Sequence, residues 1–131
     1  MASDFIWKGD GIQFALVVPG RSGAWKIGLA RLDNGRPDSF VWESPSGLDA
    51  KAAAKAITLT THRDEAGRRT AYRARLKLDA FGLDDRMLTE GIRFNLLIND
   101  NDGNLREGFI QLAPGVSEWK NFERFPLVVF D

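Results

Sequence analysis

Two stretches decide the fold: residues 11–18, GIQFALVV, and residues 24–32, AWKIGLARL. In the first, large apolar side chains occupy every second position and Gln13 lies between them, so the period of two predicts a β-strand with one buried face. The second stretch repeats this alternation around Trp25, and residues 19–23 (PGRSG) separate the two. Because glycine and proline at such a junction favour a reversal of the chain, the pair predicts an antiparallel hairpin.

The rest of the chain continues this pattern of short strands. Residues 57–62 and 70–78 predict a second hairpin, and the alternating arginines and lysine of its second arm predict one basic, solvent-exposed face. The nearly continuous apolar run at 92–98 predicts a central strand that is buried on both sides. Further short strands are expected at 39–43, 106–112 and 127–130.

Helix is expected at one place only. Residues 83–88 have the acidic pair Asp84–Asp85 near their start, which favours a helix start, and Gly91 follows as the residue that ends the helix. The alanine-rich stretch 51–55 could form a helical turn, but it is too short to be expected as a stable helix. About eight strands at hairpin spacing therefore predict an all-β fold, an antiparallel, jelly-roll-like β-sandwich with one short helix and a single domain over residues 1–131.

Charge and composition exclude several classes of function. The 131 residues contain 18 Lys and Arg against 18 Asp and Glu, so the chain lacks the basic surplus with which nucleic-acid-binding proteins neutralise phosphates. It contains no cysteine, and therefore no disulfide framework and no thiolate metal ligand. No apolar run approaches the roughly 18 residues of a membrane span, and the first residues do not resemble a signal peptide. We expect neither a nucleic-acid nor a membrane partner.

Residues 99–104 (NDNDGN) form the densest polar turn. The carboxylates of Asp100 and Asp102, with backbone carbonyls, could supply several of the six to eight oxygen ligands that calcium takes. The alternative is an ordinary hairpin turn, because Asn, Asp and Gly are the residues that tolerate left-handed conformations.

Catalytic patterns are weak. His62 is the only histidine, which leaves no histidine cluster and no spare partner for a Ser–His–Asp triad. The carboxylates mostly fall in turns, and no spacing marks a pair for glycoside hydrolysis, although separation in space rather than sequence decides that reaction. We expect a non-catalytic protein, with a small glycan-active enzyme as an alternative.

The four tryptophans carry the more specific signal. Trp25 is in phase with the apolar face of its strand and is expected in the core, whereas Trp42 fits either a buried or an exposed position. Trp7 and Trp119 lie beside charged residues and outside strong apolar runs, which favours exposure. Exposed indole rings can pack against the flat faces of sugars, while neighbouring polar groups hydrogen-bond the sugar hydroxyls.

At these residues the chain resembles a carbohydrate-binding module of family 9, within the wider group of DOMON-like β-sandwiches. The matching segments are 7–14 (WKGDGIQF) and 94–102 (FNLLINDND), followed by an arginine, a late tryptophan and the final strand at 125–128 (FPLV). Their order and spacing agree through most of the chain. The resemblance implies non-catalytic binding of a polysaccharide or oligosaccharide.

The family's site residues can be carried over individually. The two tryptophans that hold the sugar correspond to Trp7 and Trp119. Gln13 matches an acidic or amide residue that hydrogen-bonds sugar hydroxyls, and Lys26 falls where the family has a basic contact. Gly28 replaces a family asparagine, which puts the exact ligand in doubt.

The remaining expectations also follow from the resemblance. Asp10 and Arg106 belong to the matching motifs and complete the expected ligand-binding residues. Structural calcium is common in the family, which favours Asp100 and Asp102 as metal ligands. Action outside the cell or at its surface is inferred from the family alone.

The resemblance fails at the front, because family members carry further strands before the Trp-x-x-Asp strand. Without them a sandwich would expose unpaired strand edges and an apolar face. We expect a homodimer in which two copies cover each other, and the alternative is a compact variant in which residues 35–61 fill the gap. The competing function class is a structural or protein-interaction β-sandwich that binds no sugar.

Overall fold

A computed structural model describes residues 11–32, 34–100, 108–111 and 126–129, with the backbone alone for 99–100 and 108–111. Within these residues lie the strands β1 (Gly11–Val17), β2 (Trp25–Arg31), β3 (Pro37–Glu43), β4 (Ile57–Asp64), β5 (Arg69–Leu76), β6 (Ile92–Asp100), β7 (Gly108–Gln111) and β8 (Leu127–Val128). The helices are α1 (Ala50–Lys55), the 3-10 helix η2 (Leu78–Phe81) and α2 (Asp85–Glu90).

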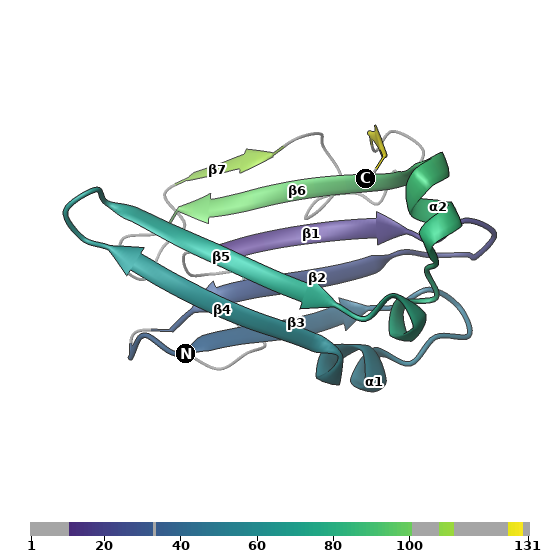
Figure 1. The fold of residues 1–131 in the computed structure, drawn as a ribbon, viewed down its shortest axis with the longest axis horizontal. Helices are drawn as coiled ribbons and strands as arrows, with labels where there is room; N and C mark the ends of the chain where they lie inside the picture. Colours follow the sequence, from purple (N-terminus) through teal and green to yellow (C-terminus); the bar gives the residue numbers. More distant parts are fainter. Residues whose placement is uncertain (1–10, 33, 101–107, 112–125, 130–131) are drawn as a thin grey trace.

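Most strands form one antiparallel sheet in the order β3-β2-β1-β6-β7, and β8 pairs with the start of β6 (Figure 1). The register places Phe14 of β1 between Ile27 of β2 and Leu96 of β6. Because residues directly opposite each other share a face of the sheet, these side chains form one apolar surface. The predicted hairpin of β1 and β2 is present, and β6 is an interior strand of the sheet as expected, but Arg93 and Ile98 are exposed, so it is not buried along its whole length.

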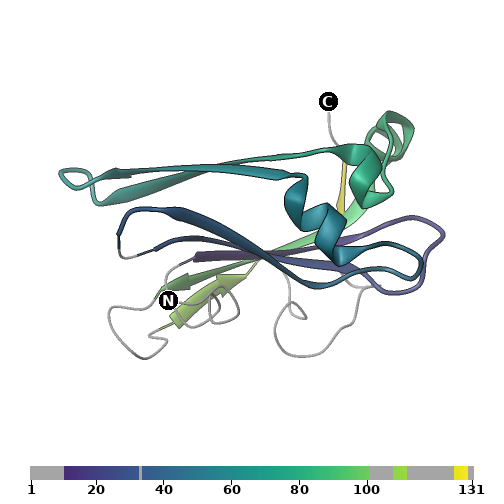
Figure 2. The same ribbon diagram turned by 90° about the horizontal axis from the view of Figure 1, so that it is seen from below.

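The β4–β5 hairpin forms a second, smaller layer over one face of this sheet (Figure 2). Every second residue of β4 is half-buried, as are Thr70, Tyr72 and Leu76 of β5, and Ile57, Leu59, Tyr72 and Leu76 pack against the core. The alternate positions are exposed. The fold is therefore a β-sandwich with two layers of unequal size.

The core lies between these layers. Phe14, Leu16, Trp25 and Ile27 come from the main sheet, and Phe81 of η2 packs against them. Trp25 is fully buried, as its phase in the sequence predicts, and its ring lies 4.8 Å from that of Phe81 between centroids.

The two α-helices are short and begin at aspartate caps. Asp49 accepts a hydrogen bond of 2.9 Å from the backbone nitrogen of Lys51 at the start of α1, and Asp84 accepts one of 2.8 Å from Met87 at the start of α2. Such caps satisfy backbone donors that have no partner within the helix. α1 lies between β3 and β4 in the chain and buries Ala53, so it connects the edge of the main sheet to the hairpin.

The predicted all-β, antiparallel fold is confirmed, and the expected helix is present as α2. α1 and η2 add to the single helix that was expected. α1 forms at the alanine-rich stretch because the Asp49 cap and the burial of Ala53 stabilise a segment that is too short to fold alone. Within the described residues, no helix has the length and apolar character needed to cross a membrane.

Candidate functional site

Polar side chains gather on the face of the main sheet that points away from the β4–β5 hairpin. Phe14 and Leu16 of β1 face the hairpin, so Gln13 points to the opposite face. On that face Lys26 of β2 and Asn95 of β6 are both directly opposite Ala15, which follows Gln13 by two residues on β1. We call this surface the polar face: it comprises Gln13, Ala15, Lys26, Gly28, Phe40, Glu43, Asn95 and Leu97.

Two amide side chains of the polar face are withdrawn from solvent. Gln13 is 1% exposed and Asn95 is fully buried. The Asn95 Oδ1 atom accepts a hydrogen bond of 2.9 Å from the backbone nitrogen of Leu96, whereas the Gln13 Nε2 atom has no hydrogen-bond partner among the described residues. A buried donor without a partner destabilises a fold by about 1–3 kcal/mol, so it marks a position where a ligand atom could bind.

An aromatic pair borders the polar face on the edge strand β3. The rings of Phe40 and Trp42 lie 5.4 Å apart between centroids at 65°, and both side chains are half-buried. Phe40 is directly opposite Gly28, which in turn is opposite Gln13. Gly28 is buried and carries no side chain, so no side chain of β2 stands between the Phe40 and Gln13 positions.

A register irregularity positions the indole of this pair. The pairing of β2 with β3 shifts between Lys26 and Ile27, so that Ile27 is opposite Val41 while Lys26 is opposite Glu43. Trp42 is the extra residue, and a bulge of this kind re-aims a side chain. The Trp42 indole nitrogen makes no hydrogen bond to any residue that the structure describes, which leaves it available as a donor.

Opposite charges complete the polar face. Lys26 and Glu43 are directly opposite each other on β2 and β3, and both are half-buried. Both side chains make further interactions, so they are held in place rather than loose at the surface. The polar face therefore combines amide, ammonium and carboxylate groups beside two aromatic rings, a set that suits a neutral ligand rich in hydroxyl groups.

The structure brings together two of the residues expected to bind a ligand. Gln13 and Lys26 lie on neighbouring strands and on the same face. The other predicted ligand-binding residues, Trp7, Asp10, Arg106 and Trp119, lie outside the described residues.

The predicted metal ligands are also untested. Asp100 ends β6, but only its backbone is described, and Asp102 lies outside the described residues. Among the side chains that the structure does describe, no group of three His, Cys, Asp or Glu is arranged to hold a metal ion. Calcium at Asp100 and Asp102 stays a prediction.

Phe40 and Trp42 are the site residues that the sequence did not single out. Their signal was present as two aromatic residues with a spacing of two in residues 39–43 (SFVWE). The same spacing is equally typical of two rings in a core, so the sequence left Trp42 ambiguous. Only the strand order shows that Phe40 shares a face with Gln13 and not with the core.

No protein-family model matches the sequence, and no curated protein or solved structure matches it either. What the polar face can bind therefore follows from its own residues.

Proposed function

We propose that this protein is a non-catalytic carbohydrate-binding domain and that the polar face with its aromatic border is the binding site. The observation that carries the proposal is the Phe40–Trp42 pair beside the unpartnered amide nitrogen of Gln13. A sugar offers flat C–H faces to aromatic rings, and its hydroxyls need fixed polar partners close to those rings. Both kinds of group are present here within two strands of each other.

Each group has a distinct role in the proposed site. The half-buried Trp42 ring stacks on a sugar ring, an interaction worth about 1–3 kcal/mol by analogy with stacked bases. At the position of Gly28, which adds no side chain, a sugar hydroxyl accepts a hydrogen bond from Gln13 Nε2. Lys26 and Glu43 orient further hydroxyls at the β2–β3 side of the site.

The resemblance to family 9 carbohydrate-binding modules adds further residues to the proposal. Trp7 and Trp119 are the proposed clamp on the sugar, and Asp10 and Arg106 are proposed as further ligand-binding residues. Structural calcium at Asp100 and Asp102, a homodimer, and action outside the cell or at its surface are proposed on the same basis.

Affinity gel electrophoresis tests the site directly. The protein is run through gels that contain soluble neutral polysaccharides (a mixed-linkage glucan, a xylan, a mannan or dextran), with and without a calcium chelator. We expect retardation by at least one neutral glycan, loss of most of it in Trp42→Ala, and recovery of much of it in Trp42→Phe, which keeps an aromatic ring. Val129→Ala, which removes an exposed apolar side chain elsewhere, should migrate like the wild type.

Three outcomes would contradict the proposal. If no neutral glycan retards the wild type, the protein is not a binding domain for such sugars. If Trp42→Ala and Gln13→Met keep full retardation while Trp7→Ala or Trp119→Ala lose it, the site is the tryptophan clamp without the polar face. Release of reducing sugar from any of these glycans would instead indicate an enzyme.

A structural or protein-interaction domain is the second candidate, and the burial of Gln13 and Asn95 favours it. Buried amides can fix the packing of a fold without any ligand. In that case tryptophan fluorescence would be insensitive to every saccharide. A blue shift or quenching by one glycan, absent in Trp42→Phe, would support the binding domain.

A further inference from the structure

Positive charge is concentrated in one segment of a chain that is neutral overall. Residues 51–77 span α1 and the β4–β5 hairpin and contain eight Lys and Arg against two Asp and Glu, whereas the whole chain contains 18 of each kind. The hairpin layer therefore carries a local basic surplus that the net charge conceals. Local fields of this kind attract anionic ligands even when the net charge is zero.

The outward face of the hairpin repeats one pair of residues, a threonine on β4 opposite an arginine on β5. Arg75 of β5 is directly opposite Thr58 of β4, and Arg73 is directly opposite Thr60. All four side chains are exposed, whereas Ile57, Leu59, Tyr72 and Leu76 at alternate positions pack against the core. We call this surface the basic ribbon: it comprises Thr58, Thr60, His62, Ala71, Arg73 and Arg75, with Lys55 and Lys77 at one end.

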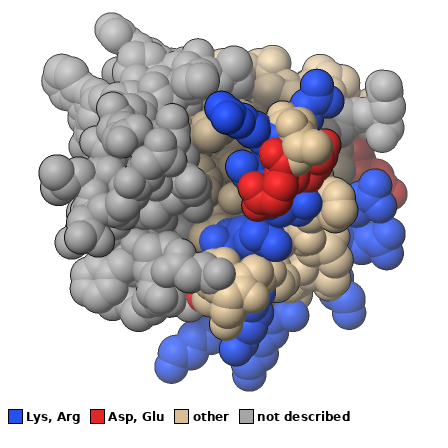
Figure 3. Space-filling model, turned by 90° about the vertical axis from the view of Figure 1, so that its left-hand side faces the viewer, with Lys and Arg blue, Asp and Glu red and all other residues tan. Residues whose placement is uncertain are grey.

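The two acidic residues of the segment are occupied at the hairpin turn. Asp64 accepts a hydrogen bond of 3.0 Å from the backbone nitrogen of Gly67, and Glu65 forms an ion pair of 3.3 Å with Arg63. Seen from the end of the molecule that carries this turn, a compact acidic group is surrounded by Lys and Arg (Figure 3). Neither carboxylate therefore neutralises the middle of the basic ribbon.

The arginines of the basic ribbon make no ion pair within the described part of the chain. Neither Arg73 nor Arg75 contacts a carboxylate there, and both point away from the core. Since two unpaired cations on one face repel each other, this arrangement adds nothing to the stability of the fold. Their charge is available to an external anion.

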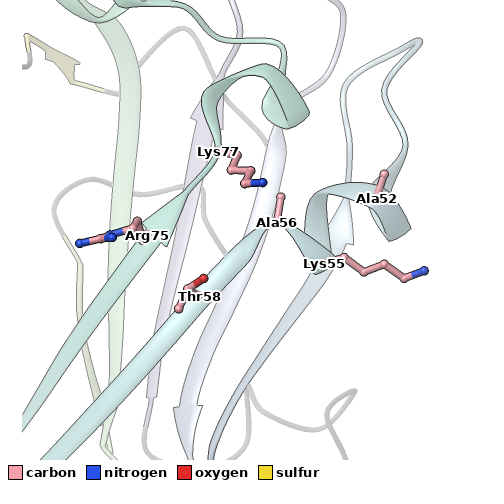
Figure 4. A pocket seen from close by; sticks show the side chains of 6 residues that line it. All are labelled: Ala52, Lys55, Ala56, Thr58, Arg75 and Lys77. Atoms are coloured by element: carbon pink, nitrogen blue, oxygen red, sulfur yellow. The ribbon is translucent and has the colours of Figure 1, made fainter.

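Hollows along the basic ribbon give such an anion a place to bind. Lys55, Thr58, Arg75 and Lys77 line a depression of about 260 Å³ where the hairpin meets α1. The Thr58 hydroxyl and the Lys77 ammonium group turn towards its centre, and Lys55 and Arg75 extend to either side (Figure 4).

A second hollow continues along the same hairpin. It has a volume of about 400 Å³ and is lined by six residues: Thr60, Thr61, His62, Ala71, Tyr72 and Arg73. The first hollow contains the Thr58–Arg75 pair and the second the Thr60–Arg73 pair. The two pairs are two residues apart, which is about 7 Å along the strand. Hydroxyl and guanidinium groups are thus repeated along a line, which suits a linear ligand with repeated anionic groups better than a single ion.

The side chains of the basic ribbon also distinguish between kinds of polyanion. Single-stranded nucleic acids are bound by basic grooves that contain aromatic rings for stacking the bases. On the described part of the hairpin the outward positions carry no Phe, Tyr or Trp: the ring among them is the His62 imidazole, and Tyr72, which borders the second hollow, packs against the core. Guanidinium and threonine hydroxyl groups instead match carboxylate or sulfate groups that alternate with sugar hydroxyls.

We propose that the basic ribbon binds an acidic polysaccharide, one that carries carboxylate or sulfate groups along its chain. This surface lies on the outer side of the hairpin layer, and the polar face lies on the far side of the main sheet. The proposal is therefore independent of the carbohydrate site proposed above.

Calorimetric titration with matched polymers tests the basic ribbon. Dextran sulfate and dextran share one sugar backbone and differ in charge, and alginate supplies carboxylate groups. We expect the wild-type protein to bind dextran sulfate or alginate, not dextran, through this surface, with an affinity that falls steeply as the NaCl concentration rises. Arg73→Gln/Arg75→Gln should weaken that binding roughly tenfold or more, because each lost cation lowers the number of counterions that the polymer releases on binding.

A charge-matched variant provides the control. Arg36→Gln/Arg86→Gln also removes two exposed arginines, one in a turn and one in α2, so it changes the net charge equally. It should bind the acidic polymer within about twofold of the wild type if position matters more than net charge. Unfolding midpoints in urea should be the same for both double variants, because all four side chains are exposed.

Three results would overturn the proposal: no binding of dextran sulfate or alginate at low salt, equal losses in the two double variants, or tighter binding of single-stranded poly(U) RNA than of either acidic glycan. The polar face is tested separately. Trp42→Ala should lose neutral glycans and keep acidic ones, and Arg73→Gln/Arg75→Gln should show the reverse. Failure at one surface is therefore distinguishable from failure at the other.

Discussion

The indole nitrogen of Trp25 donates a hydrogen bond of 2.9 Å to the backbone carbonyl of Phe81. The two rings also touch, with centroids 4.8 Å apart, and both side chains are fully buried. Trp25 begins β2 of the main sheet, while Phe81 ends η2 directly after the hairpin. This one pair therefore joins the two layers of the sandwich by both packing and hydrogen bonding.

Substitution of Trp25 should separate these two contributions. Trp25→Phe keeps a ring but leaves the Phe81 carbonyl without its partner, so we expect a loss of about 1–3 kcal/mol in the free energy of unfolding. Trp25→Ala also creates a cavity, and we expect a loss of about 3–5 kcal/mol. Urea unfolding followed by far-UV circular dichroism measures both. An unchanged unfolding midpoint for Trp25→Phe would show that the hydrogen bond contributes nothing.

Glycine substitution should distinguish backbone strain from crowding. Gly82 (φ +71°) and Gly20 (φ +81°) both adopt the left-handed conformation, in which alanine costs about 1–2 kcal/mol. A Cβ atom at Gly82 would approach the Leu48 Cδ1 atom to 2.9 Å, whereas one at Gly20 would meet nothing within 4 Å. We expect Gly82→Ala to destabilise the protein more than Gly20→Ala in thermal unfolding. Equal losses would mean that Leu48 moves aside without cost.

The positions of β1 and β2 were predictable because each of these strands has one face in the core. Ile12, Phe14 and Leu16 occupy alternate positions of β1. This periodicity predicts both that the segment is a strand and which of its faces is buried. The chain reversals were equally visible, because glycine and proline mark them. The same reasoning placed Trp25 in the core, where it is fully buried.

The burial of Gln13 was not predictable. Alternation assigns Gln13 to the side of the strand away from the apolar core, which in an antiparallel sheet commonly faces water. Gln13 is nevertheless buried, whereas the burial of Asn95 agrees with the apolar run at 92–98, which predicts a strand buried on both sides. Strand order and register, which depend on contacts distant in sequence, decide which of these positions meet Phe40 and Lys26.

The helix α1 shows how a local signal can be underestimated. Its sequence, AKAAAK, has high helix propensity, but six residues cannot form a stable helix alone. The cap at Asp49 should therefore contribute measurably, and we expect Asp49→Ala to lower the free energy of unfolding by about 0.5–2 kcal/mol. Asp49→Asn, which keeps an acceptor oxygen, should cost much less. Chemical denaturation of both variants tests this, and equal losses would assign the effect to charge rather than to the hydrogen bond.

Gln13 offers the sharpest test of the proposed carbohydrate site, because binding and stability should change in opposite directions. Its amide nitrogen is buried without a partner among the described residues, which costs the fold about 1–3 kcal/mol. Gln13→Met has a similar shape and removes the amide, so we expect the free energy of unfolding to be unchanged or higher.

The same variant should lose the hydrogen bond to the sugar hydroxyl. We therefore expect Gln13→Met to bind the neutral glycan several-fold more weakly while it unfolds at the same or a higher urea concentration, since a hydrogen bond contributes about 0.5–1.5 kcal/mol. A purely structural role for Gln13 would give the opposite pattern, with lower stability and unchanged binding. Titration calorimetry and urea unfolding on one preparation of each protein decide between the two.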